Sequence, residues 1–253
     1  MVKYVFADID DTLTTEGKLT AASYAALEAL SEAGIKVVPV TGRPAGWCDL
    51  IARLWPVAGL VGENGALYYS YDHATKTMQR AYAGTKDVRR ENQEKLNQIR
   101  DRVLAEVPGS AVSADQDFRD TDLAIDFCED VPALADQDVR RIKEIFEEAG
   151  AVAKVSSIHV NGWFGDHDKI SMTKRFCQDI FGFELQERLD QSIFVGDSPN
   201  DAPMFGFFSM SFGVANVKDF EEQMDAHPAF VTNERGGDGF VEIARALLDA
   251  RNV

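Results

Sequence analysis

The stretch Val2-Lys-Tyr-Val-Phe-Ala7, followed by Asp8-Ile-Asp10-Asp-Thr12-Leu-Thr14, sets the architecture of this chain. Its first half is rich in β-branched and aromatic residues, which is typical of a buried strand. Asp8 and Asp10 lie where that strand ends, and in an open α/β sheet ligands bind outside the carboxyl ends of the strands. Two carboxylates at such a point repel each other unless a cation or a shared proton holds them. The stretch therefore predicts a divalent metal ion beside a nucleophilic aspartate.

Composition and charge indicate a soluble globular protein and argue against a nucleic-acid partner. The chain has 253 residues, of which 45% are hydrophobic and 27% charged, as in ordinary soluble globular proteins. That length accommodates one large domain, or a core with an inserted domain. The net charge of −16 repels phosphate backbones, so we expect no nucleic-acid partner. A phosphate site in such a chain would need local positive charge or a metal ion.

Cysteine usage and hydropathy predict the compartment. No apolar stretch approaches the ~18 residues of a membrane helix, so we expect no membrane association. The first residues predict a strand rather than the apolar region of a signal peptide. Cys48, Cys128 and Cys177 are far apart and odd in number, which disfavours a disulfide framework or a zinc site. We therefore expect a cytoplasmic protein.

The N-terminal part of the chain alternates strand and helix signals. After the first strand, the pattern predicts a helix over 20–33, a strand over 35–40, a helix over 44–54 and a strand over 58–61. Gly34 supplies a helix stop, and Pro44 opens the second helix. This βαβαβ order predicts an α/β fold with a Rossmann-like parallel sheet and right-handed crossovers.

The middle of the chain has a different pattern. A hairpin is predicted over 67–82, followed by helices over 85–107 and 134–149 and by strands over 123–127, 152–155 and 158–160. The parallel pattern then resumes with a helix over 169–181, strands over 191–195, 209–214 and 229–231, and a closing helix over 239–249. The sequence therefore predicts a core domain at 1–82 and 165–253, with an inserted α+β domain at 83–164.

Four polar motifs stand at predicted strand ends or helix starts. They are Asp8 with Asp10, Thr41-Gly42, Lys169, and Asp197 with Asn200-Asp201. Each motif alone has an ordinary structural explanation, because acidic pairs often form turns or helix caps and lysines usually lie at the surface. Their occurrence together and in this order indicates one shared site.

In this order the motifs resemble those of the haloacid dehalogenase superfamily. The matching pattern is Asp8-x-Asp10-x-Thr12 after a strand, then Thr41 after a strand, Lys169 opening a helix, and Gly196-Asp-Ser-x-Asn200-Asp201. The inserted domain lies where type II phosphatases of that superfamily carry an αβ cap. The resemblance is to the type IIB branch, which includes sucrose-phosphate and mannosyl-phosphoglycerate phosphatases, and Asn64-Gly65-Ala66 fits that branch too.

The resemblance implies catalytic and metal-binding roles. Asp8 would be the nucleophile that forms an aspartyl-phosphate, and Asp10 the general acid and then the general base. Mg²⁺ would bind the Asp8 carboxylate, the Asp10 backbone carbonyl and the Asp197 carboxylate. Asn200 and Asp201 would orient the metal's water molecules or the transferring group. Oxygen ligands of this kind suit Mg²⁺.

The resemblance also implies the groups that hold the phosphate. Thr41 would donate its hydroxyl to a phosphate oxygen, beside the amide of Gly42. Lys169, at a predicted helix N-terminus, would screen Asp8 from the phosphate. Lys174 is the second candidate for this lysine, further into the helix.

Within the superfamily that the chain resembles, an acid at position 10 distinguishes between two types of reaction. Dehalogenases of the superfamily lack it, so Asp10 indicates phosphoryl transfer. The expected activity is Mg²⁺-dependent hydrolysis of a small phosphate monoester such as a sugar phosphate. A phosphomutase resembling phosphomannomutase and a non-catalytic sensor of phosphorylated metabolites are the alternatives. The products, inorganic phosphate or an isomerised sugar phosphate, distinguish hydrolase from mutase.

Selectivity is expected in the inserted domain, since the four motifs handle only phosphate and metal. Its candidate substrate contacts are polar or aromatic and lie on predicted strands or their ends: Arg119, Asp122, His159, Asn161 and Trp163, with Phe164. Each has the alternative of being an ordinary sheet-surface residue, and Trp163 with Phe164 the alternative of filling the domain junction. No feature specifies the substrate's alcohol or an oligomeric state.

Overall fold

The computed structural model describes residues 1–156 and 158–251. Its α-helices are α1 (Ala21–Glu32), α2 (Ala45–Leu54), α3 (Lys86–Glu106), α4 (Asp136–Glu148), α5 (Lys169–Phe176), α6 (Ala202–Phe207) and α7 (Gly236–Asp249). Its strands are β1 (Tyr4–Ala7), β2 (Lys36–Pro39), β3 (Leu60–Gly62), β4 (Leu67–Asp72), β5 (Thr77–Tyr82), β6 (Ala111–Val112), β7 (Leu123–Asp126), β8 (Val152–Val155), β9 (His159–Trp163), β10 (Ser192–Gly196), β11 (Ser211–Gly213) and β12 (Phe230–Val231).

The first strand lies inside a five-stranded parallel sheet of order β12-β11-β10-β1-β2. Ala7 is paired with Val195 of β10 on one side and with Pro39 of β2 on the other. The chain segments that follow these strands therefore leave the sheet at the same edge. The predicted α/β class with a parallel sheet is confirmed, and this register brings residues after Ala7, Pro39 and Val195 together.

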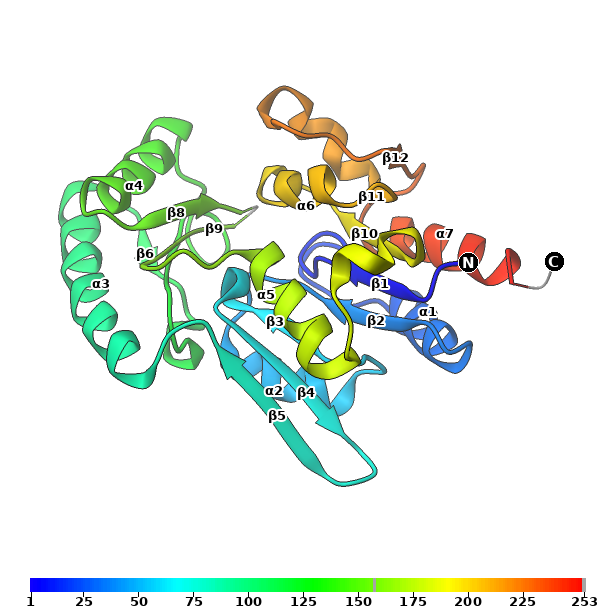
Figure 1. The fold of residues 1–253 in the computed structure, drawn as a ribbon. Coiled ribbons are helices and arrows are strands. Elements are labelled where there is room, and N and C mark those ends of the chain that lie inside the picture. The colour runs from blue at the N-terminus through cyan, green and yellow to red at the C-terminus, as the bar shows by residue number, and fades with distance from the viewer. Residues whose placement is uncertain (157, 252–253) are drawn as a thin grey trace.

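The two faces of this sheet are covered by different helices (Figure 1). Val5 and Ala7 pack into one hydrophobic cluster with residues of α1 and α7. Phe6, between them in sequence, packs on the opposite face with residues of α5 and α6. Side chains of a strand alternate between its faces, so burial on both faces explains the nearly continuous apolar run of β1.

The third predicted strand departs from the parallel pattern. One bridge, between Val40 and Val61, is parallel, but β3 pairs antiparallel with β4, and β4 with β5. The reason is the short connection at Glu63–Gly65, where all three residues have positive φ. A parallel partner would need a crossover of a dozen or more residues, whereas a tight reversal produces an antiparallel neighbour.

A second unit, which we call the cap, is built on a four-stranded antiparallel sheet of order β6-β7-β9-β8. Helices α3 and α4 contact it, and buried Leu96, Ile142, Phe146 and Val160 belong to its own hydrophobic cluster. The cap occupies the left of Figure 1, and the parallel sheet the right. The short strand β6 was not predicted, because two residues carry no detectable periodicity. The boundaries at residues 83 and 164 stay a prediction.

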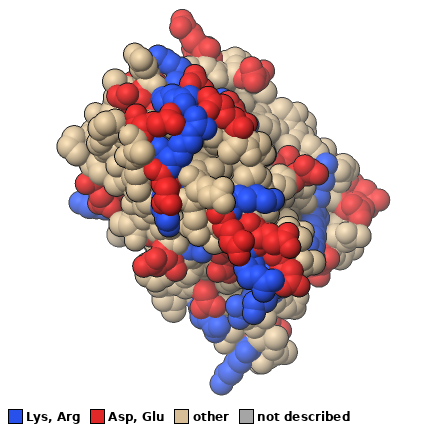
Figure 2. All heavy atoms as spheres, turned by 90° about the vertical axis from the view of Figure 1, so that its left-hand side faces the viewer, with Lys and Arg blue, Asp and Glu red and all other residues tan. Residues whose placement is uncertain are grey.

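The outward face of the cap carries charges of both signs. Arg102 binds Glu106 and Glu148, and Arg141 binds the same two glutamates from α4. Figure 2 views this side of the molecule and shows basic side chains interspersed with acidic ones. These pairs are exposed to solvent, so they contribute little to the stability of the fold.

Helix α5, the three cysteines and the apolar content of the helices bear on three further predictions from the sequence. The helix predicted over 169–181 is α-helical only to Phe176 and continues as a π-helical turn over Cys177–Phe181. Cys48 and Cys177 are buried, Cys128 is half-buried, and all three are free of disulfides. Across residues 1–156 and 158–251, no helix combines the length and apolar character needed to cross a bilayer.

Candidate active site

Three carboxylates gather at the edge of the parallel sheet. Asp8 follows β1, Asp197 follows β10, and Asp201 ends the turn of 3₁₀ helix over Pro199–Asp201. One oxygen of each lies within 4.8 Å of the others, and all three side chains are buried. The Asp8 N–H donates to the Val195 carbonyl at 2.9 Å, which extends the strand pairing into the site. The register of β1 and β10 is therefore what brings these acids together.

The carboxylates are crowded enough to change their protonation. Burial raises the pKa of Asp8 to about 7, and repulsion by Asp201 and Asp10 adds to this, while Lys169 opposes it. Burial, then repulsion by Asp201 and Asp8, also raises the pKa of Asp197. The cluster thus holds more buried negative charge than its single lysine balances. A donor set of hard carboxylate oxygens with excess negative charge fits Mg²⁺.

Lys169 lies inside this cluster. Its Nζ donates to Asp8 Oδ1 and to Asp201 Oδ1, each at 2.8 Å. Burial alone would lower its pKa, but Asp201 and Asp8 outweigh burial and raise the pKa, so the ammonium stays charged. The side chain of Asp168 caps α5 by accepting from the Ser171 N–H, which places Lys169 in the first turn. Lys174, the second candidate, instead lies over the ring of Phe207.

The loop after β2 carries Thr41 and Gly42, and Gly42 lines a pocket that Asp8 and Asp197 also line. The buried Thr41 hydroxyl accepts from the Arg43 N–H at 3.0 Å, which leaves its own proton available to a ligand. A Cβ on Gly42 would lie 3.2 Å from the side-chain amide of Asn64. Gly42 therefore keeps the backbone accessible at a point where a larger residue would press on its neighbour.

The loop after β10 is held by hydrogen bonds among its own residues and to the first loop. The Asp197 N–H donates to Asp201 Oδ2 at 3.1 Å, and Thr12 Oγ1 donates to Asp197 Oδ1 at 3.1 Å. Ser198 Oγ donates to Asn200 Oδ1 at 2.8 Å. Asp201 is thereby occupied by Lys169 and the backbone, while Asn200 lines the pocket.

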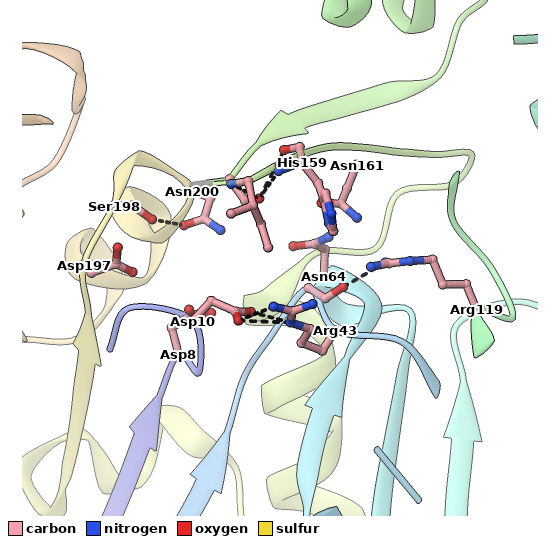
Figure 3. Close-up of a pocket in the computed structure, with 13 residues that line it drawn as sticks. Asp8, Asp10, Arg43, Asn64, Arg119, His159, Asn161, Asp197, Ser198 and Asn200 are labelled. Atoms are coloured by element: carbon pink, nitrogen blue, oxygen red, sulfur yellow. Dashed lines mark hydrogen bonds and ion pairs between the residues drawn. The ribbon is translucent and has the colours of Figure 1, made fainter. Parts of the chain in front are cut away.

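Asp10 points away from the carboxylate cluster and toward Arg43 (Figure 3). Arg43 Nε lies 3.0 Å from each Asp10 oxygen, and Nη2 donates to Asp10 Oδ1 at 2.7 Å. The guanidinium is buried and stacks over Trp47 at 4.5 Å. Sequence reasoning assigned no role to Arg43. The only available signal was its position directly after Thr41-Gly42.

The cap supplies the other wall of the pocket. Arg119, His159 and Asn161 line it together with Asp8, Asp10, Gly42, Asp197 and Asn200 of the parallel unit. Arg119 Nη1 donates to the Gly42 carbonyl at 3.0 Å, so the cap contacts the loop after β2 directly. Asp122 lies behind this wall and accepts from Arg119 and Asn161. Figure 3 shows His159 and Asn161 facing Asp10 and Arg43 across the pocket.

The two remaining cap candidates, Trp163 and Phe164, do not line this pocket. Trp163 is buried, and its Nε1 donates to the His167 carbonyl while its ring stacks on that of His167. Trp163 instead lines a neighbouring cavity with Lys169 and Asn200, near the junction of the two units.

Two further residues at the junction, Glu63 and Asn64, were given no role from the sequence. Glu63 is fully buried and accepts from the N–H groups of Ala45 in α2 and of Asp120 and Thr121 in the cap, at 2.9, 2.8 and 2.7 Å. Burial, with repulsion by Asp122, raises its pKa to about 7. Asn64 is 5% exposed, lines the pocket, and its Nδ2 has no partner among the described residues. The contacts of Glu63 join residues distant in sequence, which no local pattern reveals.

Gly65 controls how closely this junction packs against α5. Its φ is +100°, and a Cβ there would overlap the Asp168 carbonyl just before Lys169. Gly65→Ala is therefore expected to lower the free energy of unfolding by about 3 kcal/mol, the sum of backbone strain and overpacking. Urea unfolding followed by circular dichroism measures this.

Gly34→Ala is the matched control for that change. Gly34 also has positive φ, +76°, but nothing lies within 4 Å of a Cβ there. Its loss should be about 1 kcal/mol, from backbone strain alone. Equal losses at the two glycines would contradict the steric explanation.

The N-terminal part of the chain resembles a known protein family in sequence. The family model for haloacid dehalogenase-like hydrolases matches residues 5–94, which include Asp8, Asp10 and Thr41. No curated protein matches the chain.

Solved structures are similar over the whole chain. Protein 0175 of Thermoplasma acidophilum is 16% identical, with a TM-score of 0.72 over 97% of this chain and 98% of that one. A haloacid dehalogenase-like hydrolase from Bacteroides thetaiotaomicron is 16% identical, with a TM-score of 0.64 over 98% and 100%. The sucrose-phosphatase of Synechocystis sp. PCC6803, in complex with sucrose and phosphate, is 14% identical, with a TM-score of 0.64 over 97% and 98%.

At sequence identities this low, the solved structures show only that the fold is shared. The family match, in contrast, shows a similarity in sequence over the segment that carries Asp8, Asp10 and Thr41. The two agree, because the matched motifs stand at the sheet edge where the carboxylates meet. Residues 5–94 therefore resemble haloacid dehalogenase-like hydrolases in sequence, and the chain as a whole shares its fold with solved structures that include such a hydrolase.

Proposed function

We propose that this protein is a Mg²⁺-dependent phosphatase that cleaves a small phosphate monoester, a sugar phosphate, through an aspartyl-phosphate on Asp8. The observation that carries the proposal is the buried cluster of Asp8, Asp197, Asp201 and Lys169 opening into the pocket that Asp10 lines. A carboxylate can approach a phosphate monoester, itself a dianion near neutral pH, only where positive charge is concentrated.

The proposed reaction has two steps. Asp8 attacks phosphorus, forming an oxygen–phosphorus bond as the bond to the alcohol oxygen breaks, and Asp10 gives that oxygen a proton. Asp10 then takes a proton from water, which attacks the aspartyl-phosphate, releases inorganic phosphate and restores Asp8. General acid–base assistance of this kind contributes about 10²–10⁴-fold.

Four groups would hold the phosphate in this scheme. They are the hydroxyl of Thr41, the amide of Gly42, the ammonium of Lys169 and the side chain of Asn200. The free proton of Thr41 and the charge of Lys169 support these roles. Positioning of the phosphoryl group with stabilisation of its charge accounts for most of the catalysis in phosphoryl transfer.

The metal site would be formed by the carboxylates of Asp8 and Asp197 and the backbone carbonyl of Asp10, with Asp201 orienting its surroundings. Bound there, Mg²⁺ would neutralise charge on the transferring group. The hydrogen bonds of Asp201 to Lys169 and to the Asp197 N–H support an orienting role.

The cap supports the choice of substrate. Its pocket wall of Arg119, His159 and Asn161 is polar, as a hydroxyl-rich alcohol requires. The sucrose-phosphatase with a similar fold was solved with sucrose and phosphate bound. The domain boundaries, a core at 1–82 and 165–253 with a cap at 83–164, and a cytoplasmic location are part of the same proposal.

Release of inorganic phosphate from a panel of phosphorylated sugars, polyols and glycerates tests the function. We expect Mg²⁺-dependent turnover that EDTA abolishes and added Mg²⁺ restores. The half-saturating Mg²⁺ concentration should be higher at about pH 6 than at about pH 8, because below its pKa of about 7 Asp8 must lose a proton to bind metal. An affinity that does not change with pH would contradict the assignment of Asp8 as a ligand.

The same panel distinguishes the alternatives. An isomerised sugar phosphate with little free phosphate would indicate a phosphomutase. Thermal stabilisation by phosphorylated ligands without turnover of any of them would indicate a sensor.

A further inference from the structure

Arg43 stands between carboxylates of the two structural units. On one side it holds both oxygens of Asp10, from the loop after β1. On the other, Nη2 lies 3.2 Å from Glu129 Oε1 and Nη1 lies 3.6 Å from Asp115 Oδ2, both in the cap. The Arg43 side chain is 7% exposed, so little water competes for these contacts.

The two closest carboxylates share one nitrogen atom. Nη2 donates to Asp10 Oδ1 at 2.7 Å and to Glu129 Oε1 at 3.2 Å. Burial alone would lower the pKa of Arg43, but Asp10 and then Glu129 outweigh burial and raise it. The planar guanidinium has a fixed donor geometry, so a change at Glu129 alters the orientation in which Asp10 is held.

Glu129 is itself held from within the cap. The side chain of Asp126, at the end of β7, accepts from the N–H groups of Cys128, Glu129 and Asp130. His159 Nε2, on β9, lies 2.8 Å from Glu129 Oε2. A continuous series of contacts therefore runs from His159 in the cap wall through Glu129 and Arg43 to Asp10.

We propose that Arg43 is a positioning residue that couples the seating of the cap to the placement of Asp10, through Glu129. The inference rests on the proposed function, since it concerns the acid of that reaction. With the cap seated, Glu129 and Asp115 hold the guanidinium where it orients Asp10. With the cap displaced, Arg43 loses both cap carboxylates. Proton transfer needs its donor within hydrogen-bond reach of the leaving oxygen, so it is efficient only under the seated cap.

Two substrates whose leaving groups differ in basicity can separate an effect on proton donation by Asp10 from an effect on binding. A 4-nitrophenolate departs readily without a proton, whereas phenolate, of nearly the same shape, benefits from one. For Glu129→Gln we expect kcat/KM to fall about 10-fold with phenyl phosphate and less than about 3-fold with 4-nitrophenyl phosphate. Arg43→Lys, which keeps the charge but loses the planar fork, should show the same selectivity with a larger loss.

A double substitution and a control complete the experiment. Arg43→Lys combined with Glu129→Gln should be no worse than Arg43→Lys alone, since both act through one contact. Glu106→Gln, which removes an ion-paired cap glutamate far from the pocket, should leave both esters unaffected. The Glu129 side chain is 31% exposed, so Glu129→Gln is expected to fold, and its melting temperature verifies this.

Two results would overturn the inference alone: equal losses with both esters, or additive losses in the double variant. Either would mean that Arg43 and Glu129 act on binding or stability rather than on Asp10. Absence of Mg²⁺-dependent turnover of either ester by the unsubstituted enzyme would overturn the proposed function, and the inference with it.

Discussion

Replacing Asp8 by asparagine is expected to lower kcat/KM by about 10⁴-fold or more, the scale seen when a nucleophile is removed. Asparagine has nearly the same shape but no charge, so it neither attacks phosphorus nor binds a metal ion effectively. It also removes one of the two carboxylates that Lys169 contacts. Phosphate release from the best substrate of the panel measures the loss.

The loop that carries Asp8 also offers a matched control. Asp11→Asn is the same substitution three positions further on, at a residue with a φ of +54° that asparagine tolerates. We expect a change of less than about 10-fold there, because Asp11 has no part in the proposed chemistry. Full turnover by Asp8→Asn, in a variant that melts like the unsubstituted enzyme, would end the proposed mechanism.

Replacing Lys169 by methionine is expected to have the second largest effect. Asp8 and Asp201 would lose the only cation within 4 Å of either among the described residues, and removing one partner of a buried ion pair typically costs about 3–5 kcal/mol. We also expect a loss of kcat/KM of about 10³-fold, since the positive charge that is proposed to face the phosphate is gone.

The dependence of this destabilisation on pH provides a further check. The native pKa of Asp8, raised to about 7, would rise further without Lys169. A raised acid pKa means that the native state favours the protonated form, so the variant should lose stability as pH rises and regain it as pH falls. Melting temperatures at about pH 5 and about pH 8, without metal, measure this.

Lys174→Met, on the same helix, is the control for Lys169→Met. Its ammonium lies over the ring of Phe207, so its loss should leave turnover unchanged. A Lys169→Met variant that is equally destabilised at both pH values would indicate a packing defect rather than uncompensated negative charge.

Local sequence patterns predicted the individual helices and strands of the parallel sheet. The apolar run of β1, the alternation with helices and the glycine and proline signals at helix ends led to the parallel sheet, since each reflects the period or the ends of a single element. The acids at the strand ends followed from the same logic, because adjacent parallel strands deliver their carboxyl ends to one edge. Asp8 and Asp197 meet there, although they are far apart in the chain.

Other features depended on partners that no local pattern identifies. The antiparallel pairing of β3 follows from three consecutive residues with positive φ at Glu63–Gly65, two of which are not glycine. The contacts of Arg43 with Glu129, and of Glu63 with Asp120, join the parallel unit to the cap across long stretches of sequence. Residue type and spacing therefore identified carboxylates and a lysine that the fold brings together. The orientation of Asp10 and the wall of the pocket depend on contacts between the cap and the parallel unit, so only the tertiary structure revealed them. The physical reason is that a buried charged side chain is oriented by the partners packed around it, and these partners are distant in sequence.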